Sequence, residues 1–151
     1  MVDHEALIDE LVEIHNAAAF DRLAEIFTDD YVEEYPQSHE VIRGLDNARA
    51  VRMHYPGGLG TGKAPMDRST LHLATADEQW VMTPTFQPVR VEGSGKVGTM
   101  VYWASYADGS RWLCVGMYEL RGDKIAHTRV YFAPELEPPD WRAPYRDSAA
   151  K

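Results

Sequence analysis

The spacing of the hydrophobic residues changes near the middle of the chain. In the first third, apolar residues recur three and four positions apart, which is the repeat of an amphipathic helix, and Asp3 precedes them as an N-cap residue. This pattern predicts a first helix from Asp3, a second short helix over residues 23–27, and a third that begins near Gly44 and ends before residues 56–58. Between the last two, residues 31–36 alternate as a short strand that ends at a proline.

From residue 68 onward the pattern changes to simple alternation, which is typical of strands. The predicted strands span residues 70–74, 79–83, 97–107, 111–120 and 124–133. Asp-Gly and Gly-Asp pairs join the last three, and such pairs between alternating runs are a strong hairpin signal. Helices followed by a run of hairpins predict an α+β fold, with the helices gathered on one face of an antiparallel sheet.

The length and composition indicate one globular domain. A chain of 151 residues is too short for two ordinary domains, and its apolar and charged fractions of 44% and 26% are typical of globular proteins. We expect this domain to span residues 1–133. A Pro-rich tail over residues 134–151 should then lie over the domain surface or fray.

The net charge of −9 argues against nucleic acid and against anionic membrane surfaces as partners, since both are recognised by Lys and Arg. One cysteine, Cys114, excludes an intramolecular disulfide. The N-terminus lacks the basic and apolar regions of a signal peptide, and no apolar run approaches the roughly 20 residues that span a bilayer. A cytoplasmic location is the default expectation.

The sequence predicts no cofactor and no metal. The run from Gly57 to Ala64 nearly fits a phosphate-binding loop, but Ala64 stands where a Ser or Thr must bind magnesium. The run also follows a predicted helix, whereas a phosphate-binding loop follows a strand. Neither a His-Glu-x-x-His run nor paired cysteines are present to hold zinc.

Two stretches of the chain resemble the nuclear-transport-factor-2-like (NTF2-like) superfamily. The first is the run 27–36 (FTDDYVEEYP) followed by 42–44 (IRG), and the second is the run 118–125 (YELRGDKI) followed by 130–132 (VYF). The tail from Phe132 to Pro144 is similar to a bacterial, SnoaL-like subgroup. The resemblance implies a cone-shaped, curved antiparallel sheet with three N-terminal helices, the cystatin-like α+β roll, around a pocket for an apolar small molecule.

This superfamily includes ketosteroid isomerases, limonene epoxide hydrolases, scytalone dehydratases and polyketide cyclases. The catalytic residues of two of these enzymes do not transfer to this chain. The general base of the isomerase falls on Tyr35, and its two oxyanion donors fall near Leu11 and Leu113. The water-activating acid of the epoxide hydrolase falls on Val130. The resemblance therefore predicts a fold and not a reaction.

The strongest candidate site is the face that Tyr31, Glu33 and Tyr35 share on the first strand. If this face turns inward, as the resemblance implies, desolvation should raise the pKa of Glu33 toward the range of a general base. Tyr35 would then donate a hydrogen bond to a carbonyl or enolate. The alternative is that Glu33 and Glu34 are solvated charges at the end of the strand.

His54 is a third catalytic candidate, because the helix that it ends should lie across the mouth of the cone in this fold. Its alternative is a structural role, as for His72 and His127. The predicted binding residues are Tyr31, Tyr55, Trp80, Trp103 and Met117.

Large aromatic side chains fall on both faces of the predicted sheet, since neighbours such as Tyr102 and Trp103 point to opposite sides. One face would line the cone and the other would be exposed on a monomer, which predicts a homodimer through the sheet. The alternative is that the Pro-rich tail covers these aromatic residues.

Together these observations favour a cofactor-independent enzyme that acts on a hydrophobic, carbonyl-type metabolite by proton transfer, as an isomerase, cyclase or dehydratase. The first alternative is a non-catalytic ligand-binding or dimerisation module. An epoxide hydrolase comes third, because it needs an acid where Val130 stands. A buried carboxylate with a shifted pKa would favour the enzyme, and a filled interior would favour the module.

Overall fold

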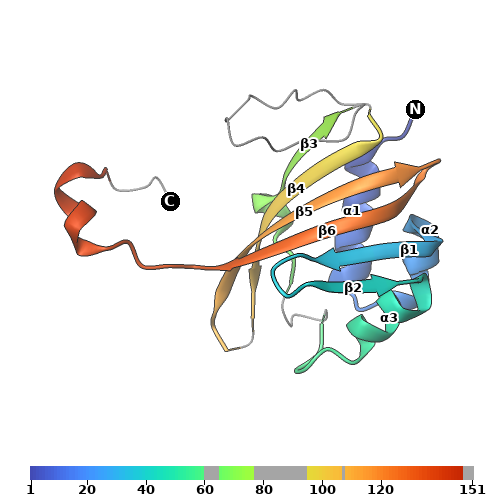
Figure 1. Cartoon of the computed structure of the whole chain (residues 1–151), viewed down its shortest axis with the longest axis horizontal. Helices are drawn as coiled ribbons and strands as arrows, with labels where there is room; N and C mark the ends of the chain where they lie inside the picture. The colour runs from blue at the N-terminus through green and yellow to red at the C-terminus, as the bar shows by residue number, and fades with distance from the viewer. Residues whose placement is uncertain (60–64, 77–94, 107, 148–151) are drawn as a thin grey trace.

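The computed structural model describes residues 1–59, 65–76, 95–106 and 108–147, which fold into three α-helices and one six-stranded sheet (Figure 1). The helices are α1 (His4–Asn16), α2 (Leu23–Ile26) and α3 (Leu45–Met53). The strands are β1 (Phe27–Tyr35), β2 (Glu40–Arg43), β3 (His72–Ala76), β4 (Val97–Ser105), β5 (Arg111–Arg121) and β6 (Lys124–Pro134). Short 3-10 helices are η1 (Phe20–Arg22), η2 (Arg68–Thr70) and η3 (Asp140–Tyr145).

The sheet is mixed, with the strand order β2-β1-β6-β5-β4-β3, and it curves around α1 (Figure 1). Within the described strands, four pairings are antiparallel and one, between β1 and β6, is parallel. The predicted α+β class, with three N-terminal helices on one face of a curved sheet, is confirmed. The parallel pair is the exception to the predicted antiparallel arrangement, because β1 enters the sheet beside a strand that lies about 95 residues later.

Helix α1 begins where capping chemistry predicts. The side chain of Asp3 accepts a hydrogen bond of 3.0 Å from the backbone N–H of Ala6, which satisfies a free donor in the first turn of α1. Helix α3 follows Gly44, whose φ of +85° favours glycine. The buried apolar side chains of α1 are Leu7, Ile8, Leu11, Val12 and Ile14.

The side chain of His4, in the first turn of α1, forms hydrogen bonds with β5 and with the residue before β4. Its Nδ1 lies 2.7 Å from the hydroxyl of Tyr118, and its Nε2 lies 2.7 Å from the carbonyl oxygen of Gly95. A neutral imidazole satisfies both partners when Nε2–H donates to Gly95 and Nδ1 accepts from Tyr118. Gly98 makes room for this contact, because a Cβ at that position would lie 2.2 Å from the Tyr118 ring.

The C-terminal segment leaves the domain and does not lie over it (Figure 1). Beyond β6 the chain runs outward and ends in η3, and the side chains of Leu136, Trp141 and Tyr145 are 79%, 70% and 86% exposed. Of the two expectations for this tail, that it lies over the domain surface or that it frays, the first is not met by the described residues. Pro138 and Pro139 favour extended backbone here, and Pro139 has φ −66° and ψ 142°.

Some sequence predictions fall outside the described residues. These are the strand at 79–83 with Trp80, most of the turn at 92–95, and the greater part of the glycine-rich run at 57–64. No helix in the described part of the chain is long and apolar enough to cross a membrane.

Candidate ligand pocket

A cavity of about 680 Å³ lies between the sheet and the helices, a size typical of small-molecule sites. It forms because alternate residues of β1, β4, β5 and β6 point toward the helices. Its walls are largely apolar and aromatic, and they include Phe27, Tyr102, Trp112, Val130 and Phe132. The interior is therefore not filled by the protein's own side chains.

Glu33 supplies a charged group to the cavity although its residue surface is only 1% exposed. Its Oε2 accepts hydrogen bonds from the hydroxyl of Tyr31 at 2.8 Å and from Nη2 of Arg52 at 2.6 Å. Its Oε1 accepts a hydrogen bond from the hydroxyl of Tyr35. Three donors thus hold this carboxylate in one orientation at the floor of the cavity.

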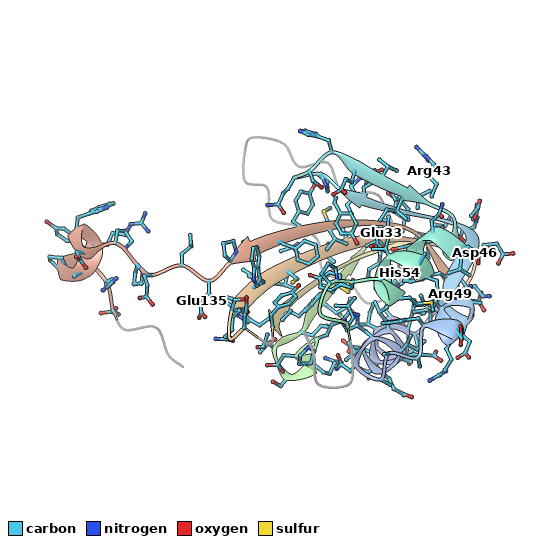
Figure 2. The ribbon with its side chains drawn as sticks, turned by 90° about the horizontal axis from the view of Figure 1, so that it is seen from below. Glu33, Arg43, Asp46, Arg49, His54 and Glu135 are labelled. Atoms are coloured by element: carbon cyan, nitrogen blue, oxygen red, sulfur yellow. The ribbon has the colours of Figure 1, made fainter. Side chains whose placement is uncertain are left out.

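Two neighbouring elements bring these groups together. Strand β1 places Tyr31, Glu33 and Tyr35 on its inward face, and α3 packs across that face and carries Arg52 (Figure 2). Arg52 is itself anchored, because its Nη1 donates to the carbonyl of Ala48 at 2.9 Å, one turn earlier. The guanidinium carbon also lies 5.7 Å from the centroid of the Phe27 ring, a cation–π distance.

Burial and Arg52 act in opposite directions on Glu33. Desolvation, the largest single effect, raises its pKa, but the charge of Arg52 and the hydrogen bonds from Tyr35, Arg52 and Tyr31 together bring the pKa below its usual 4.5. Glu33 is therefore ionised at neutral pH. The two tyrosines remain protonated donors, because burial and the adjacent carboxylate raise their pKa values.

Both sequence readings of Glu33 need correction. Desolvation was expected to raise its pKa, but the net shift is downward, because Arg52 was not recognised as its partner. Glu33 is not a solvated charge at the end of the strand either. Glu34 is the more exposed of the two acids, and it bonds His127 at 2.8 Å and Arg129 at 3.3 Å across to β6.

The structure gathers some of the predicted site residues and separates others. Tyr31, Glu33, Tyr35 and Tyr55 all line the cavity. His54 does not line it; the residue is exposed, and its Nδ1 lies 2.9 Å from the carbonyl oxygen of Ala50. His54 therefore does not lie at the cavity where its catalytic role was expected.

Trp103 and Met117 are also absent from the cavity walls, contrary to prediction. Tyr102 and Ala104 line the cavity, so Trp103 between them faces the opposite side of β4, where the Arg111 guanidinium lies 4.7 Å from the centroid of its ring. Met117 pairs in register with Arg129 on that same side. Alternation correctly separated the two faces, but the wrong set was assigned to the cavity.

Arg52 is the main site residue that the sequence reading missed. Its signal is the spacing of Ala48, Arg52 and Tyr55, which places a cation on the helix face that also carries buried residues. A buried cation requires a buried anion, and the inward face of β1 supplies Glu33.

The outer end of the cavity is aromatic and polar. The rings of Tyr55 and Tyr106 stack with centroids 6.4 Å apart, and Tyr106 meets Trp112 edge-on at 6.4 Å. Glu40 and Asp108 from two hairpins also line the cavity here. On the wall, burial raises the pKa of the Cys114 thiol to about 11, so this thiol is protonated and weakly reactive at neutral pH.

No protein-family model and no curated protein matches the sequence. Solved structures do match. An NTF2-like protein of unknown function from Burkholderia xenovorans is 26% identical, with 97% of this chain and 94% of that chain covered and a TM-score of 0.68. A putative ketosteroid isomerase from Kribbella flavida is 17% identical, with 97% and 89% covered and a TM-score of 0.65.

An epoxide hydrolase of M. tuberculosis, described as LEH-like, also shares the fold. It is 15% identical, with 85% of this chain and 80% of that chain covered and a TM-score of 0.52. At such identities, the likeness to the isomerase and to the hydrolase concerns the fold alone.

Proposed function

Because this chain belongs to the NTF2-like superfamily, we propose that its cavity binds an apolar carbonyl compound and that Glu33 and Arg52 transfer a proton beside the carbonyl. The observation that supports this proposal is the buried Glu33–Arg52 pair, with 2.6 Å between the two charged groups, at the floor of a cavity of about 680 Å³. Enolate formation needs a base for the C–H proton and a cation or donor for the oxygen. In an enolisable carbonyl compound, the C–H proton lies on the carbon next to the carbonyl group, so the base and the donor to the oxygen must also be close together.

The proton transfer conserves the charge of the site. Glu33 takes the proton from the carbon beside the carbonyl, the C–H electron pair becomes part of a C=C bond, and the carbonyl π electrons move to oxygen. The negative charge thus moves from Glu33 to an oxygen beside Arg52, and no ion crosses from water into the cavity. Return of the proton from Glu33 to a different carbon completes an isomerisation.

Arg52 has the donors that this role requires. A guanidinium carries five N–H groups, and the described hydrogen bonds to Glu33 and Ala48 use two of them. When a substrate oxygen accepts from Arg52, the attraction of the guanidinium for Glu33 is shared and the pKa of Glu33 rises. The base therefore becomes stronger only when a substrate is bound.

The tyrosines have positioning roles in this proposal. Tyr31 and Tyr35 donate to Glu33 itself, so they fix the direction of its free lone pairs and do not bind the substrate carbonyl. Tyr55 lies at the aromatic outer end of the cavity, where it would pack against the body of the ligand.

The proposal is tested by exchange of substrate hydrogen for deuterium, which detects enolisation without knowledge of the natural substrate. 2-Tetralone and 2-indanone are incubated in deuterium oxide with the protein, and incorporation is followed by mass spectrometry. We expect the wild type to exceed the buffer rate and Glu33→Gln to lose at least about 100-fold of that excess. Glu34→Gln, on the adjacent residue of the same strand, is the matched control and should lie within about threefold of the wild type. No exchange by the wild type, or full exchange by Glu33→Gln, would refute the proposal.

The second candidate is a ligand-binding protein without turnover. It is favoured by the hydrogen bonds that already reach both oxygens of Glu33 and by a pKa that is low for a general base. The same samples separate the two functions, because binding of 2-tetralone that quenches tryptophan fluorescence without deuterium incorporation indicates binding alone. An epoxide hydrolase is less well supported, since Val130 faces the cavity where such an enzyme needs an acid.

A further inference from the structure

The outer end of the cavity has a chemistry that the proposed proton transfer does not use. It lies where the β1–β2 and β4–β5 hairpins reach the same end of the sheet (Figure 1). The backbone N–H of Phe132 donates to Oε1 of Gln37 at 2.6 Å, and the rings of Tyr35 and Phe132 stack with their centroids 6.0 Å apart. The β1–β2 hairpin is therefore held against β6 at the edge of the cavity.

The β4–β5 hairpin holds a carboxylate next to an indole ring. The hydroxyl of Ser110 donates to Oδ1 of Asp108 at 2.6 Å and accepts a hydrogen bond from Nε1 of Trp112 at 3.2 Å. The backbone N–H of Ser110 donates to the same Asp108 oxygen at 2.9 Å. These hydrogen bonds from Ser110 lower the pKa of Asp108, so its carboxylate is ionised at neutral pH. One serine thus positions both an anion and an aromatic ring that line the cavity.

Two tyrosines complete an aromatic corner beside this carboxylate. The ring of Tyr106 meets that of Trp112 at an interplanar angle of 78°, and Tyr55 stacks on Tyr106 at 24°. Rings at nearly right angles present their faces to the same space, and the face of an aromatic ring is its electron-rich side. A cation within about 6 Å of such a face is attracted to it, and the attraction is stronger where water is excluded.

The described residues that line the cavity carry an excess of negative charge. Their carboxylates are those of Glu33, Glu40 and Asp108, and Arg52 is the only lysine or arginine among them. Arg52 pairs with Glu33 at the floor of the cavity, so within the described lining no basic side chain neutralises the two acids of the outer end. An ammonium group on a ligand would supply the positive charge that this end lacks.

We propose that the ligand of this cavity carries an alkylammonium group, which lies against the rings of Tyr106 and Trp112 with Asp108 as its counter-ion. The carbonyl end of the ligand rests on the proposed function, in which the oxygen accepts from Arg52, and the ammonium end does not. The substrate class is then an amino ketone with an apolar body between the two groups. The floor offers N–H donors, which bind an oxygen and not a cation, so the two ends of the cavity specify one orientation of the ligand.

The first test measures the binding of two alcohols that have the same shape and differ in charge. [4-(Hydroxymethyl)phenyl]trimethylammonium and 4-tert-butylbenzyl alcohol differ only by nitrogen in place of one carbon, and neither contains a carbonyl group. We expect calorimetric titration of the full chain at low salt to show at least about tenfold tighter binding of the cation. Asp108→Asn and Trp112→Leu should each reduce that preference at least about threefold. Equal affinities in the wild type, or a preference that both variants retain, would overturn the proposal.

Asp123→Asn is the matched control, because it removes one exposed charge from the turn at the other end of β5. It should leave the preference for the cation within about twofold of the wild type. An equal loss in Asp123→Asn and Asp108→Asn would show attraction by the net charge of −9 and would overturn the site. Asp108 is itself exposed, so its replacement is informative even if Trp112→Leu impairs folding.

The second test uses the matching ketones, (4-acetylphenyl)trimethylammonium and 4-tert-butylacetophenone, in the deuterium exchange assay. We expect the KM of the ammonium ketone to be at least about tenfold lower than that of its neutral counterpart, and Asp108→Asn to raise it. Equal KM values would overturn the substrate class. Absence of exchange from both ketones would refute the proton transfer alone, because the alcohols bind without enolisation. Alcohols of equal affinity would overturn the cation site, whether or not the ketones exchange.

Discussion

The replacement of Arg52 by methionine tests the electrostatic balance at the floor of the cavity. The substitution keeps an apolar stem in α3 but leaves the Glu33 carboxylate buried with only two tyrosine donors. Removal of one partner of a buried ion pair lowers the free energy of unfolding by about 3–5 kcal/mol. We expect a loss in this range for Arg52→Met at pH 7, since Glu33 is almost fully buried and the pair is in direct contact.

The same substitution should reverse the pH dependence of stability. In the wild type the pKa of Glu33 is below its usual 4.5, so the stabilisation is present above that pH and is lost as the pH falls through the folded-state pKa. Without Arg52, we expect desolvation, the largest single effect, to outweigh the hydrogen bonds from Tyr35 and Tyr31 and to raise the folded-state pKa of Glu33 above 4.5. The folded variant then binds a proton that the unfolded chain does not, so its stability increases as the pH falls from 7 toward 5, by up to about 1.4 kcal/mol per pH unit.

Urea unfolding at pH 5, 6 and 7, followed by tryptophan fluorescence, measures both effects. Arg43→Met on β2 is the control, because Arg43 is an exposed arginine in the neighbouring strand (Figure 2). The reasoning fails if Arg52→Met lowers the free energy of unfolding at pH 7 by less than about 1 kcal/mol. It also fails if the free energy of unfolding of the variant changes with pH as that of the wild type does. A double variant, Glu33→Gln with Arg52→Met, should recover part of the loss, since no buried charge remains.

Two further predictions concern the packing around the sheet. Gly98→Ala should lower the free energy of unfolding by about 1–3 kcal/mol, because its Cβ would collide with a Tyr118 ring that His4 holds in place, and thermal unfolding measures the loss. An unchanged melting temperature would contradict that packing. The native Cys114 thiol should react with a thiol reagent at pH 8 at least tenfold more slowly than the urea-unfolded chain, because burial raises its pKa to about 11. Equal rates in the two states would show that the thiol is accessible.

The elements that could be predicted from the sequence are those with local causes. Helix α1 depends on the Asp3 cap and on a three-and-four spacing, and the β5–β6 hairpin depends on the two-residue turn Gly122-Asp123. Alternation placed Tyr31, Glu33 and Tyr35 on one face of β1, but only the family resemblance implied that this face turns inward. Each of these signals lies within about ten residues of the element that it specifies.

The missed features depend on contacts between distant parts of the chain. The Glu33–Arg52 pair joins a strand to a helix, and the packing of α3 across β1 determines which buried carboxylate receives the cation. For β4, alternation separates Tyr102 from Trp103 but contains no information on which of them faces the helices. The direction of the C-terminal segment beyond β6 depends on where that strand ends, which no local pattern specifies.

The parallel pairing of β1 with β6 has a consequence for biosynthesis. Phe27 lies opposite Ile125 and Glu33 lies opposite Thr128. Strand β1 can therefore pair with β6 only after about 95 further residues have been synthesised. Such long-range pairing forms slowly, whereas the β4–β6 hairpins can close as soon as they emerge. On the ribosome, β1 and β2 therefore join the rest of the sheet only after β6 has been made, and a nascent chain that stops before residue 124 lacks the strand that connects β1 to β5.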